Sequence, residues 1–553
     1  MRKNKNYPYY DVTPFGSIRE LLEIAVREAG DKIAFRYKEG GKPHAVTYRA
    51  FYEDTRALGT ALAAIGKDTA HVSVIGENSY KWITVFLTML QSRGVLVPVD
   101  KELPCADIIH VLEHADSEVL FYSKKYEKYI PQLMEALPNI QYFIGFDVVE
   151  ESERVLSWQK FIDMGRQRLL EGDKTFIEAV SSPAELREIV YTSGTTGMAK
   201  GVMLSEENLV NIIYHGLRNT SLKTVCLSVL PLHHTFESGS VLFALHSHAT
   251  ICINENMKAV LKNLQLYKPD YIVVVPAFAE IFYKKIWANA KESGKTALLK
   301  TMIPVSNFLR RLGIDLRRKL FSSIHAAFGG NLEVIVCGGA PLRASLGKFF
   351  DDIGINLING YGITECSPII SANRNDFNDP ATVGMPLPCI AVRIDNPSSE
   401  GDGEICVQGK TVMMGYYKDE EKTREAIRDG WFYTGDYGRF NEKGQLLITG
   451  RKKNLIVLKN GNNVFPEELE EYVMQIPYVA EVVVRGICDE NESEVGLMAE
   501  VFLSEDAPKE NVEKVLLDDI HKVCAELPIY KNISKVKIRD TEFVKTTTNK
   551  IKR

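Results

Sequence analysis

The stretch Ile189-Val-Tyr-Thr-Ser-Gly-Thr-Thr-Gly-Met-Ala-Lys-Gly201 carries the strongest indication of fold and chemistry in this sequence. A β-type apolar run leads into six small or hydroxylated residues, and a lysine, Lys200, follows shortly after. Backbone N–H groups and hydroxyls in such a loop can surround phosphate oxygens, and the lysine adds positive charge. A flexible Ser/Thr/Gly connector is the alternative, but linkers are rarely held between a strand and a Lys-Gly pair. We therefore predict that residues 192–200 bind phosphate.

This loop differs from the Walker A loop that many nucleotidases use. Gly201 follows Lys200 where Walker A requires Ser or Thr, and the glycine spacing also differs. The difference argues against the runner-up class, a kinase-type or motor-type nucleotidase.

Around the loop, short apolar runs alternate with helical patterns. Strands are expected at Val72–Gly76, Gly94–Val99, Val119–Tyr122 and Tyr271–Val275, and helices at Thr47–Ile65 and Glu280–Asn289. That alternation predicts an α/β fold with mostly parallel sheets. Because 553 residues exceed one ordinary core, we predict a large N-terminal α/β domain of several subdomains over residues 1–450.

The sequence changes character near residue 450. The basic run Arg451-Lys-Lys-Asn454 comes first, and Asn460-Gly461 then predicts a hairpin because both residues tolerate positive φ. Pro466 opens a helix expected at Glu467–Gln475, with acidic residues in its first turn. We predict a small, mobile α+β domain over residues 451–553, joined by a hinge at residues 451–454.

Composition limits the partners. Lys+Arg 67 against Asp+Glu 72 gives a net charge of −5, so no general attraction to nucleic acid is expected. Nine cysteines without a CxxC pair, no secretory signal and no apolar run of membrane-spanning length predict a cytoplasmic protein without a transmembrane segment. Weak contact with a membrane surface and the oligomeric state are left open.

The segment YTSGTTGMAKG resembles the signature loop of the adenylate-forming superfamily, which includes acyl-CoA synthetases, luciferases and peptide-synthetase adenylation domains. Further motifs follow in the family's order from Thr47-Tyr48 to Lys550. The resemblance implies that a carboxylic acid is activated with ATP as an acyl-adenylate, with release of pyrophosphate, and that a thiol then accepts the acyl group. ATP, Mg²⁺ and coenzyme A are the cofactors that it implies.

The same resemblance assigns the nucleotide site. The loop residues Thr192, Ser193, Gly194, Thr195, Thr196, Gly197 and Lys200 would hold the phosphates and pyrophosphate, and Gly339, Ala340 and Pro341 would lie against adenine. In Asn359-Gly360-Tyr361-Gly362-Ile-Thr364-Glu365, the tyrosine would stack on adenine, the threonine would contact phosphate, and the glutamate would hold Mg²⁺ together with Thr192. The alternative for residues 336–341 is an ordinary strand-to-helix turn.

The remaining assignments concern catalysis and movement. Lys550 would contact the carboxylate and the α-phosphate, and His234 would stand at the gate of the acyl pocket in Pro231–Glu237. Asp436 would accept hydrogen bonds from the ribose hydroxyls, with Arg451 on the ribose or the phosphates; an Asx turn is the alternative for the aspartate. Lys453 would be the hinge, and the loop around Gly461 would line the thiol tunnel. Two departures from the family pattern are Asn549 in place of glycine and Lys459-Asn460-Gly461 in place of Ser-Gly-Gly.

The acyl substrate is predicted from two segments, Leu230–Glu237 and Gly450–Asn454, which resemble bacterial long-chain fatty acyl-CoA synthetases. A medium- or long-chain fatty acid with coenzyme A is expected. Loading of an acyl carrier protein and ligation of an aryl or other acid are the alternatives. A non-catalytic nucleotide-binding protein would require loss of Lys550 or Glu365, and both are present. A luciferase-type activity is disfavoured because the sequence does not end in Ser-Lys-Leu.

Overall fold

The computed structural model of the chain describes residues 9–192, 199–459, 463–488, 494–545 and 551. Contacts within the chain divide it into two units, residues 1–391 with 408–432 and residues 392–407 with 433–553. We call them unit 1 and unit 2 and describe each by itself. The hinge expected at residues 451–454 remains a prediction about movement.

The first sheet of unit 1 has eight strands in the order β19-β9-β8-β4-β3-β5-β6-β7. From β8 to β7 all neighbours are parallel, whereas β8, β9 and β19 pair antiparallel. The strands are β3 (His71–Ile75), β4 (Val95–Pro98), β5 (Val119–Tyr122), β6 (Tyr142–Gly145), β7 (Val155–Ser157), β8 (Leu186–Thr192), β9 (Lys200–Ser205) and β19 (Gly415–Tyr416). The helices connecting or flanking them are α2 (Tyr48–Ala64), α3 (Tyr80–Leu90), α4 (Cys105–His114), α5 (Ile130–Ala136), α6 (Trp158–Leu170) and α15 (Glu420–Ala426).

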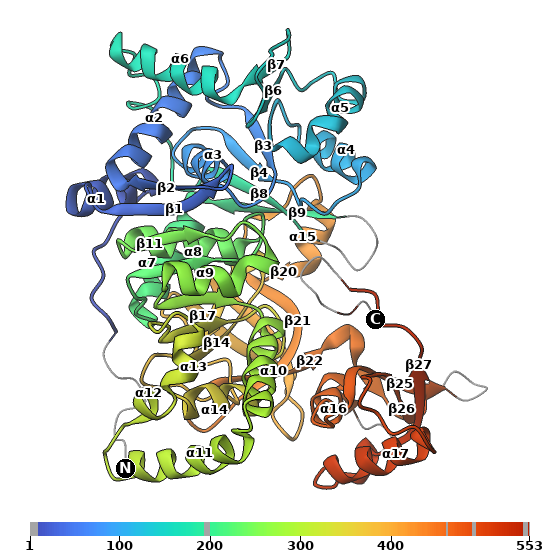
Figure 1. Cartoon of the computed structure of the whole chain (residues 1–553). Helices are drawn as coiled ribbons and strands as arrows, with labels where there is room; N and C mark the ends of the chain where they lie inside the picture. Colours follow the sequence, from blue (N-terminus) through green and yellow to red (C-terminus); the bar gives the residue numbers. More distant parts are fainter. Residues whose placement is uncertain (1–8, 193–198, 460–462, 489–493, 546–550, 552–553) are drawn as a thin grey trace. The chain divides into compact units, whose positions relative to one another are not determined.

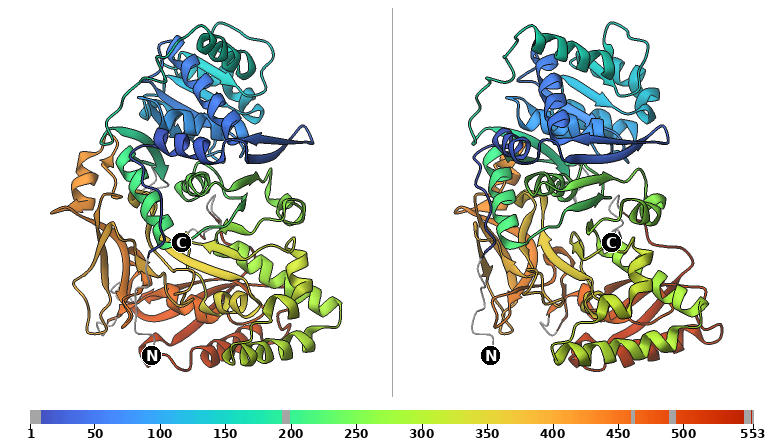
Figure 2. Two further views of the ribbon diagram at one scale, coloured as in Figure 1. Left: turned by 90° about the vertical axis from the view of Figure 1, so that its left-hand side faces the viewer. Right: turned by 60° about the vertical axis from the view of Figure 1, so that its left-hand side comes forward.

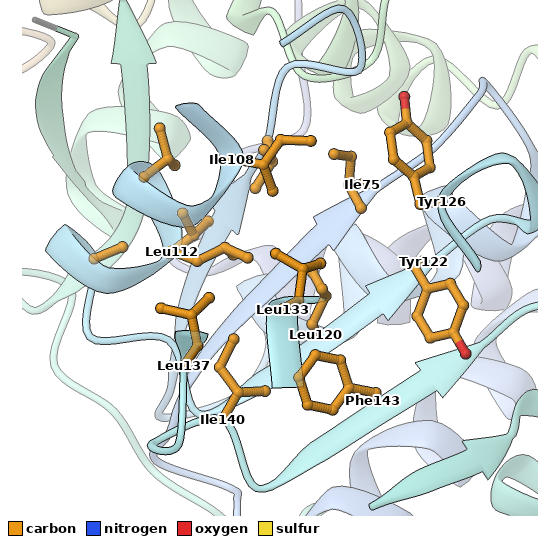
Figure 3. Packing of buried hydrophobic residues seen from close by; sticks show 14 of the residues in the cluster. Ile75, Ile108, Leu112, Leu120, Tyr122, Tyr126, Leu133, Leu137, Ile140 and Phe143 are labelled. Carbon is orange, nitrogen blue, oxygen red and sulfur yellow. The ribbon is translucent and has the colours of Figure 1, made fainter. Parts of the chain in front are cut away.

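The core of this sheet shows why its short strands are apolar along their whole length. Leu120 of β5 and Phe143 of β6 pack against Leu112 of α4 and Leu133 of α5, and all four are buried (Figure 3). Because helices cover the faces of a parallel sheet, both faces of each strand must be apolar. That is the pattern from which β5 was predicted.

The second sheet of unit 1 has nine strands in the order β16-β15-β14-β13-β12-β10-β11-β1-β2. Its strands are β1 (Ile33–Glu39), β2 (Lys42–Thr47), β10 (Val225–Ser228), β11 (Thr250–Ile253), β12 (Tyr271–Val274), β13 (Val334–Cys337), β14 (Asn356–Gly362), β15 (Ile369–Ala372) and β16 (Met385–Pro386). Its helices are α1 (Ile18–Ala29), α7 (Glu206–Asn219), α8 (Thr235–His246), α9 (Val260–Tyr267), α10 (Pro276–Glu292), α11 (Thr296–Arg311), α12 (Arg317–Leu320), α13 (Ser322–Ala327) and α14 (Ala344–Asp352). The six strands from β14 to β1 run parallel.

Helices α1, α7 and α8 pack against one another, with α8 also on β10 and β11 and α7 on β9. Figures 1 and 2 show the two sheets of unit 1 as successive layers with these helices between them. Unit 1 is therefore an α/β structure built from two sheets.

Unit 2 contains a small antiparallel region and a terminal α+β region. The division between the units passes within β17 (Ile390–Asp395), β18 (Gly403–Gly409) and β21 (Trp431–Phe440), while β22 (Leu446–Arg451) lies wholly in unit 2. The terminal region has β25 (Val479–Cys488), β26 (Glu494–Leu503) and β27 (Ile533–Arg539) in one sheet, a short pair β23 (Ile456–Val457) and β24 (Asn463–Val464), and helices α16 (Pro466–Val473) and α17 (Val512–Val523). Leu469 of α16 and Leu516 of α17 are buried in its own core.

The fold-class prediction, a large α/β part with mostly parallel sheets and a small α+β part, is confirmed. Expected strand and helix positions agree within a few residues. The helix predicted at 280–289 begins earlier, at Pro276, because proline is favoured in the first turn. Strands β23 and β24 pair antiparallel, as a hairpin requires, but Asn460 and Gly461 lie outside the described residues. Among the described residues, no helix combines the length and the apolar character needed to cross a membrane.

Candidate active site

The ends of the predicted phosphate loop are fixed by strand pairing. Thr192, the last residue of β8, is the Cα partner of Lys200, the first residue of β9. The two strands therefore bring both ends of the loop together. Ser193, Gly194, Thr195, Thr196 and Gly197 lie outside the described residues.

Lys200 belongs to a polar group that also contains Tyr416 and Glu365. Strand β19 pairs with β9, and this pairing places the Lys200 Nζ 4.9 Å from the centre of the Tyr416 ring. The Tyr416 hydroxyl donates a hydrogen bond of 3.0 Å to Glu365 Oε1. Burial, together with the Glu365 carboxylate, raises the pKa of Tyr416 far above its usual value, so the phenol remains a donor. We call these three residues the polar triad.

Sequence reasoning missed Tyr416. It follows Gly415 and comes 51 positions after Glu365 in the chain, and no spacing rule connects two such distant residues. The only sequence feature that could have pointed to this residue is the pair of tyrosines, Tyr416 and Tyr417, directly after Gly415.

Glu365 and Thr364 lie in a 3-10 turn, η3 (Thr364–Cys366), directly after β14. The backbone N–H of Met413 donates to the Glu365 carbonyl oxygen at 2.8 Å, which fixes the turn to the segment that carries Tyr416. In the part of the chain that the structure describes, no three His, Cys, Asp or Glu side chains converge on a point. A single carboxylate fits Mg²⁺, which usually takes one or two protein oxygens and completes its shell with phosphate and water.

The segment assigned to adenine is formed by the adjacent ends of β13 and β14. Cys337 and Asn359 are Cα partners there, so Gly338–Gly339 and Gly360–Gly362 continue side by side. A Cβ on Gly362 would lie 1.8 Å from the Pro368 carbonyl oxygen, and Gly339 has φ +80°. The chain therefore needs glycine at both positions. Half-buried Tyr361 lies between Gly360 and Gly362, and Ala340 and the exposed Pro341 continue the turn after β13.

Asn359 has a structural contact. It is 4% exposed, and its side-chain nitrogen donates to the Thr382 carbonyl oxygen at 3.1 Å. Its carbonyl oxygen accepts from the backbone N–H of Asn373 at 2.9 Å. These bonds tie β14 to the chain at 373–382, and nucleotide contact by Asn359 stays a prediction.

An apolar cavity opens beside this segment, entirely within unit 1. The space between its walls is about 910 Å³, part of which is open to solvent. Its wall includes the carboxyl ends of β12, β13 and β14, where ligands bind in α/β folds. Lining residues include Gly239 and Phe243 of α8, Val273, Val336, Tyr361 and Leu387.

His234 is the N-cap residue of α8, at the start of the helix that forms one wall of the cavity. The preceding turn is held by Asn78, whose side chain accepts from the Leu232 N–H at 3.1 Å and donates to the Leu230 carbonyl oxygen at 2.6 Å. His233 Nε2 lies 3.2 Å from Asp100 Oδ1. Burial tends to raise the pKa of Asp100, but His233, the backbone N–H of Glu102 and the charge of His234 together outweigh it and lower this pKa to about 2. The position of His234 is thus set by contacts that the sequence did not indicate.

Glu237, one turn into α8, supports the same turn from the other side. It is 1% exposed and accepts a short hydrogen bond from the Ser228 hydroxyl. Burial raises the pKa of Glu237 to about 8, against the opposing effect of hydrogen bonds from Ser228 and from the backbone of Leu230 and Val229. The carboxyl is therefore largely protonated at neutral pH.

In unit 2, Asp436 and Arg451 contact each other. They are Cα partners on β21 and β22, and Arg451 Nε lies 2.7 Å from Asp436 Oδ1, with the aspartate side chain 4% exposed. The contact with Arg451 holds the Asp436 carboxylate, which is predicted to bind the ribose, in one orientation. Lys453 is exposed in a 3-10 turn, η4 (Lys452–Asn454), while Gly461, Asn549 and Lys550 lie outside the described residues.

The chain is similar in sequence to proteins of a known family. The family described as AMP-binding enzyme matches residues 22–417. Long-chain-fatty-acid--CoA ligase FadD15 of Mycobacterium bovis is 32% identical over 78% of this chain and 73% of its own length. Long chain acyl-CoA synthetase 4 of Arabidopsis thaliana is 30% identical, with 80% and 71% covered.

Solved structures show the same fold. The anthranilate CoA ligase AuaEII with anthranoyl-AMP superposes with a TM-score of 0.78 at 20% identity, covering 100% of this chain and 97% of that one. ATP-bound MatB from Rhodopseudomonas palustris gives 0.75 at 22% identity, with 96% and 97% covered. Fold and site together define a nucleotide-dependent α/β enzyme. The chain belongs to the AMP-binding enzyme family, and the resemblance inferred from its motifs is confirmed.

Proposed function

We propose that this enzyme is a fatty acid:coenzyme A ligase that forms AMP. The observation that carries the proposal is the apolar cavity beside Tyr361 and the glycine-rich ends of β13 and β14. A cavity with almost no polar wall suits a hydrocarbon chain, and burial of each methylene contributes about 0.8 kcal/mol. Relatives named as long-chain fatty acid ligases support the same substrate class.

In the first step, a carboxylate oxygen of the acid forms a bond to the α-phosphorus of ATP, and the bond to pyrophosphate breaks. Negative charge grows on the phosphoryl oxygens and on the leaving group, so positioned positive charge lowers the barrier. Lys200, with the loop after Thr192, is proposed to bind the pyrophosphate, and Lys550 the carboxylate and α-phosphate. Bound Mg²⁺, held by Glu365 with Thr192, would neutralise phosphate charge.

In the second step, the sulfur of coenzyme A attacks the acyl carbonyl carbon, and AMP leaves with the electron pair of the broken C–O bond. No side-chain nucleophile is needed in either step. We propose that the segment from residue 451 turns about Lys453 between the steps, so that Lys550 withdraws and the thiol enters near Gly461.

We also propose that the enzyme is cytoplasmic. All nine cysteines are free, which supports this location.

The test is pyrophosphate release with acetate, octanoate, palmitate, oleate and benzoate, each with coenzyme A or an acyl carrier protein as acceptor. kcat/KM should rise about fourfold for each added methylene until the cavity is full. Better activity with benzoate or acetate than with every longer acid would exclude the fatty acid proposal while leaving acid activation intact. ADP and inorganic phosphate as products would exclude the AMP-forming reaction itself.

The hinge proposal has a separate test, Lys453→Pro. Proline fixes φ near about −65° and restricts the residue before it, so the chain should be held in one orientation. Acyl-adenylate should still form, whereas transfer to the thiol should slow by roughly 10²-fold, the order of effect that misplacing a reacting group produces. Lys453→Ala is the control, because it removes the side chain and leaves φ free. Normal thioester turnover by the proline variant would place the hinge elsewhere.

A further inference from the structure

Helix α11 exposes an apolar stripe to solvent, on the side away from its buried residues. Leu298, Val305, Phe308 and Leu312 are 57%, 44%, 60% and 62% exposed. Together with Thr301 they recur at alternating spacings of three and four residues, which places them along one side of a helix. The buried residues of this helix, Leu299 and Ser306, lie on another side.

This exposure is concentrated. Of the eighteen large apolar side chains that are exposed among the described residues, six lie between residues 281 and 314. Scattered single apolar residues are normal on a protein surface, but a continuous stripe is typical of an interaction site. The stripe ends in a turn that exposes Ile314 by 48%.

The surroundings of the stripe are basic. Residues 276–320 contain ten Lys and Arg but three Asp and Glu, a net of +7 in a chain whose net charge is −5. Arg310 pairs with Asp351 of α14, and Arg317 pairs with both Asp351 and Asp315. Seven exposed lysines and arginines have no ion pair within the described part of the chain, and these are Lys284, Lys285, Lys291, Lys295, Lys300, Arg311 and Lys319. At 100° per residue, Lys300 and Arg311 fall along one border of the stripe.

We propose that α11 docks this enzyme on the surface of an anionic phospholipid bilayer. An apolar helix face bordered by Lys and Arg inserts into the boundary between headgroups and acyl chains, and the cations contact anionic headgroups. A second copy of this chain is the competing occupant, but two such basic surfaces facing each other would repel. The charge therefore selects the lipid surface.

The position of α11 in the chain connects the docking surface with the apolar cavity. β12 contributes Val273 to the cavity wall, and the chain then passes along α10 directly into α11. Figure 1 shows α10 running down to α11, which lies at the end of unit 1 far from α6. An enzyme bound to the bilayer through α11 would be close to fatty acid that has partitioned into the bilayer. Only this supply of substrate rests on the proposed function, because the docking itself does not depend on it.

The experiment is co-sedimentation of the full chain with two kinds of vesicle. One kind is phosphatidylcholine alone, and the other contains roughly 30% phosphatidylglycerol, an anionic lipid that makes the surface potential negative. Binding should be at least about tenfold tighter to the anionic vesicles and should weaken as salt screens the charges. The double variant Phe308→Glu with Leu312→Glu should lose binding. Lys300→Ala and Arg311→Ala should each weaken it by about fivefold.

The matched control is Leu170→Glu, which makes the same change at a residue 84% exposed at the end of α6. This control should bind vesicles as the unchanged chain does, and circular dichroism should show all variants folded. Equal binding by the Phe308→Glu/Leu312→Glu variant, or no preference for anionic vesicles, would overturn the proposal. So would self-association, measured by analytical ultracentrifugation, that the same double variant abolishes. Activity on detergent-dispersed acid, measured in parallel, separates failure of docking from failure of the proposed reaction.

Discussion

The apolar cavity and the polar triad lie in the same unit, but they are built in opposite ways. The cavity is lined by helix α8 and the ends of three parallel strands, and its space depends on small residues such as Gly239. Lys200, Tyr416 and Glu365 come from three separate segments, and each is held by a specific contact with another of the three. Volume should therefore decide which acid the enzyme accepts, whereas the triad should decide how fast any acid reacts.

The largest effect is expected from Glu365→Gln. The change keeps the shape of the side chain but removes the charge proposed to hold Mg²⁺. We expect acid-dependent ATP–pyrophosphate exchange to fall by about 10²- to 10³-fold, the cost of removing one positioned electrostatic group. The loss should be similar for short and long acids. A loss that depended on chain length would contradict the separation of the two regions.

Next in size is Gly239→Leu, which fills the cavity. Among the described residues, a Cβ at this position meets Pro368 Cδ at 3.8 Å and nothing closer, so the new side chain enters open space. If it displaces two or three methylenes of the longest acid, kcat/KM for that acid should fall by about 10- to 100-fold.

The shortest acids should be unaffected by Gly239→Leu, and steady-state kinetics over a series of chain lengths provides the measurement. Gly239→Ala is the control for changing glycine within a helix, which alanine favours. It should lower kcat/KM for the longest acid in the same direction but by less than Gly239→Leu. An equal loss for all acids would show that α8 affects the chemistry as well as the volume.

A smaller effect is expected from Tyr416→Phe. The variant keeps the ring beside Lys200 but removes the hydrogen bond to Glu365. One hydrogen bond to a charged group contributes about 1.5–3 kcal/mol, and because Glu365 itself is retained we expect adenylation to slow by about tenfold, the lower end of that range. If the hydroxyl positions Glu365, the Mg²⁺ concentration needed for half-maximal rate should rise, and excess Mg²⁺ should restore part of the rate. A lower rate with unchanged Mg²⁺ dependence would mean that Tyr416 acts only on the packing.

The smallest effect on rate is expected at Glu237 beside the cavity, where the change concerns stability. Its folded pKa of about 8 exceeds the ordinary value of 4.5, so the folded state retains a proton that the unfolded state loses. This contribution to stability is fully present below about pH 4.5 and is lost as pH rises towards 8. Glu237→Gln should remove that loss.

The free energy of unfolding measured in urea at several pH values tests this. The difference between the variant and the unchanged chain should move in favour of the variant from pH 5 to pH 8, the interval set by the two pKa values. A difference independent of pH would show that Glu237 titrates normally. Ser228→Ala, which removes one hydrogen-bond donor to the Glu237 carboxyl but keeps the carboxyl itself, is measured in the same way for comparison.

The sequence by itself determined the fold class, whereas the nucleotide-site residues assigned by resemblance stay predictions. Buried parallel strands require apolar residues on both faces, and that signal is local, so β3, β5 and β12 could be placed from their own residues.

Only the tertiary structure decided which distant side chains meet. Tyr416 reaches Glu365 because β19 pairs with β9, and Asp100 reaches His233 because β4 ends near the turn before α8. The pairing of Asp436 with Arg451 depends in the same way on the register of β21 and β22. The exposed stripe of α11 had the spacing of an ordinary buried helix face. Periodicity shows that apolar residues share a side of a helix, but packing alone decides whether that side faces the core or the solvent.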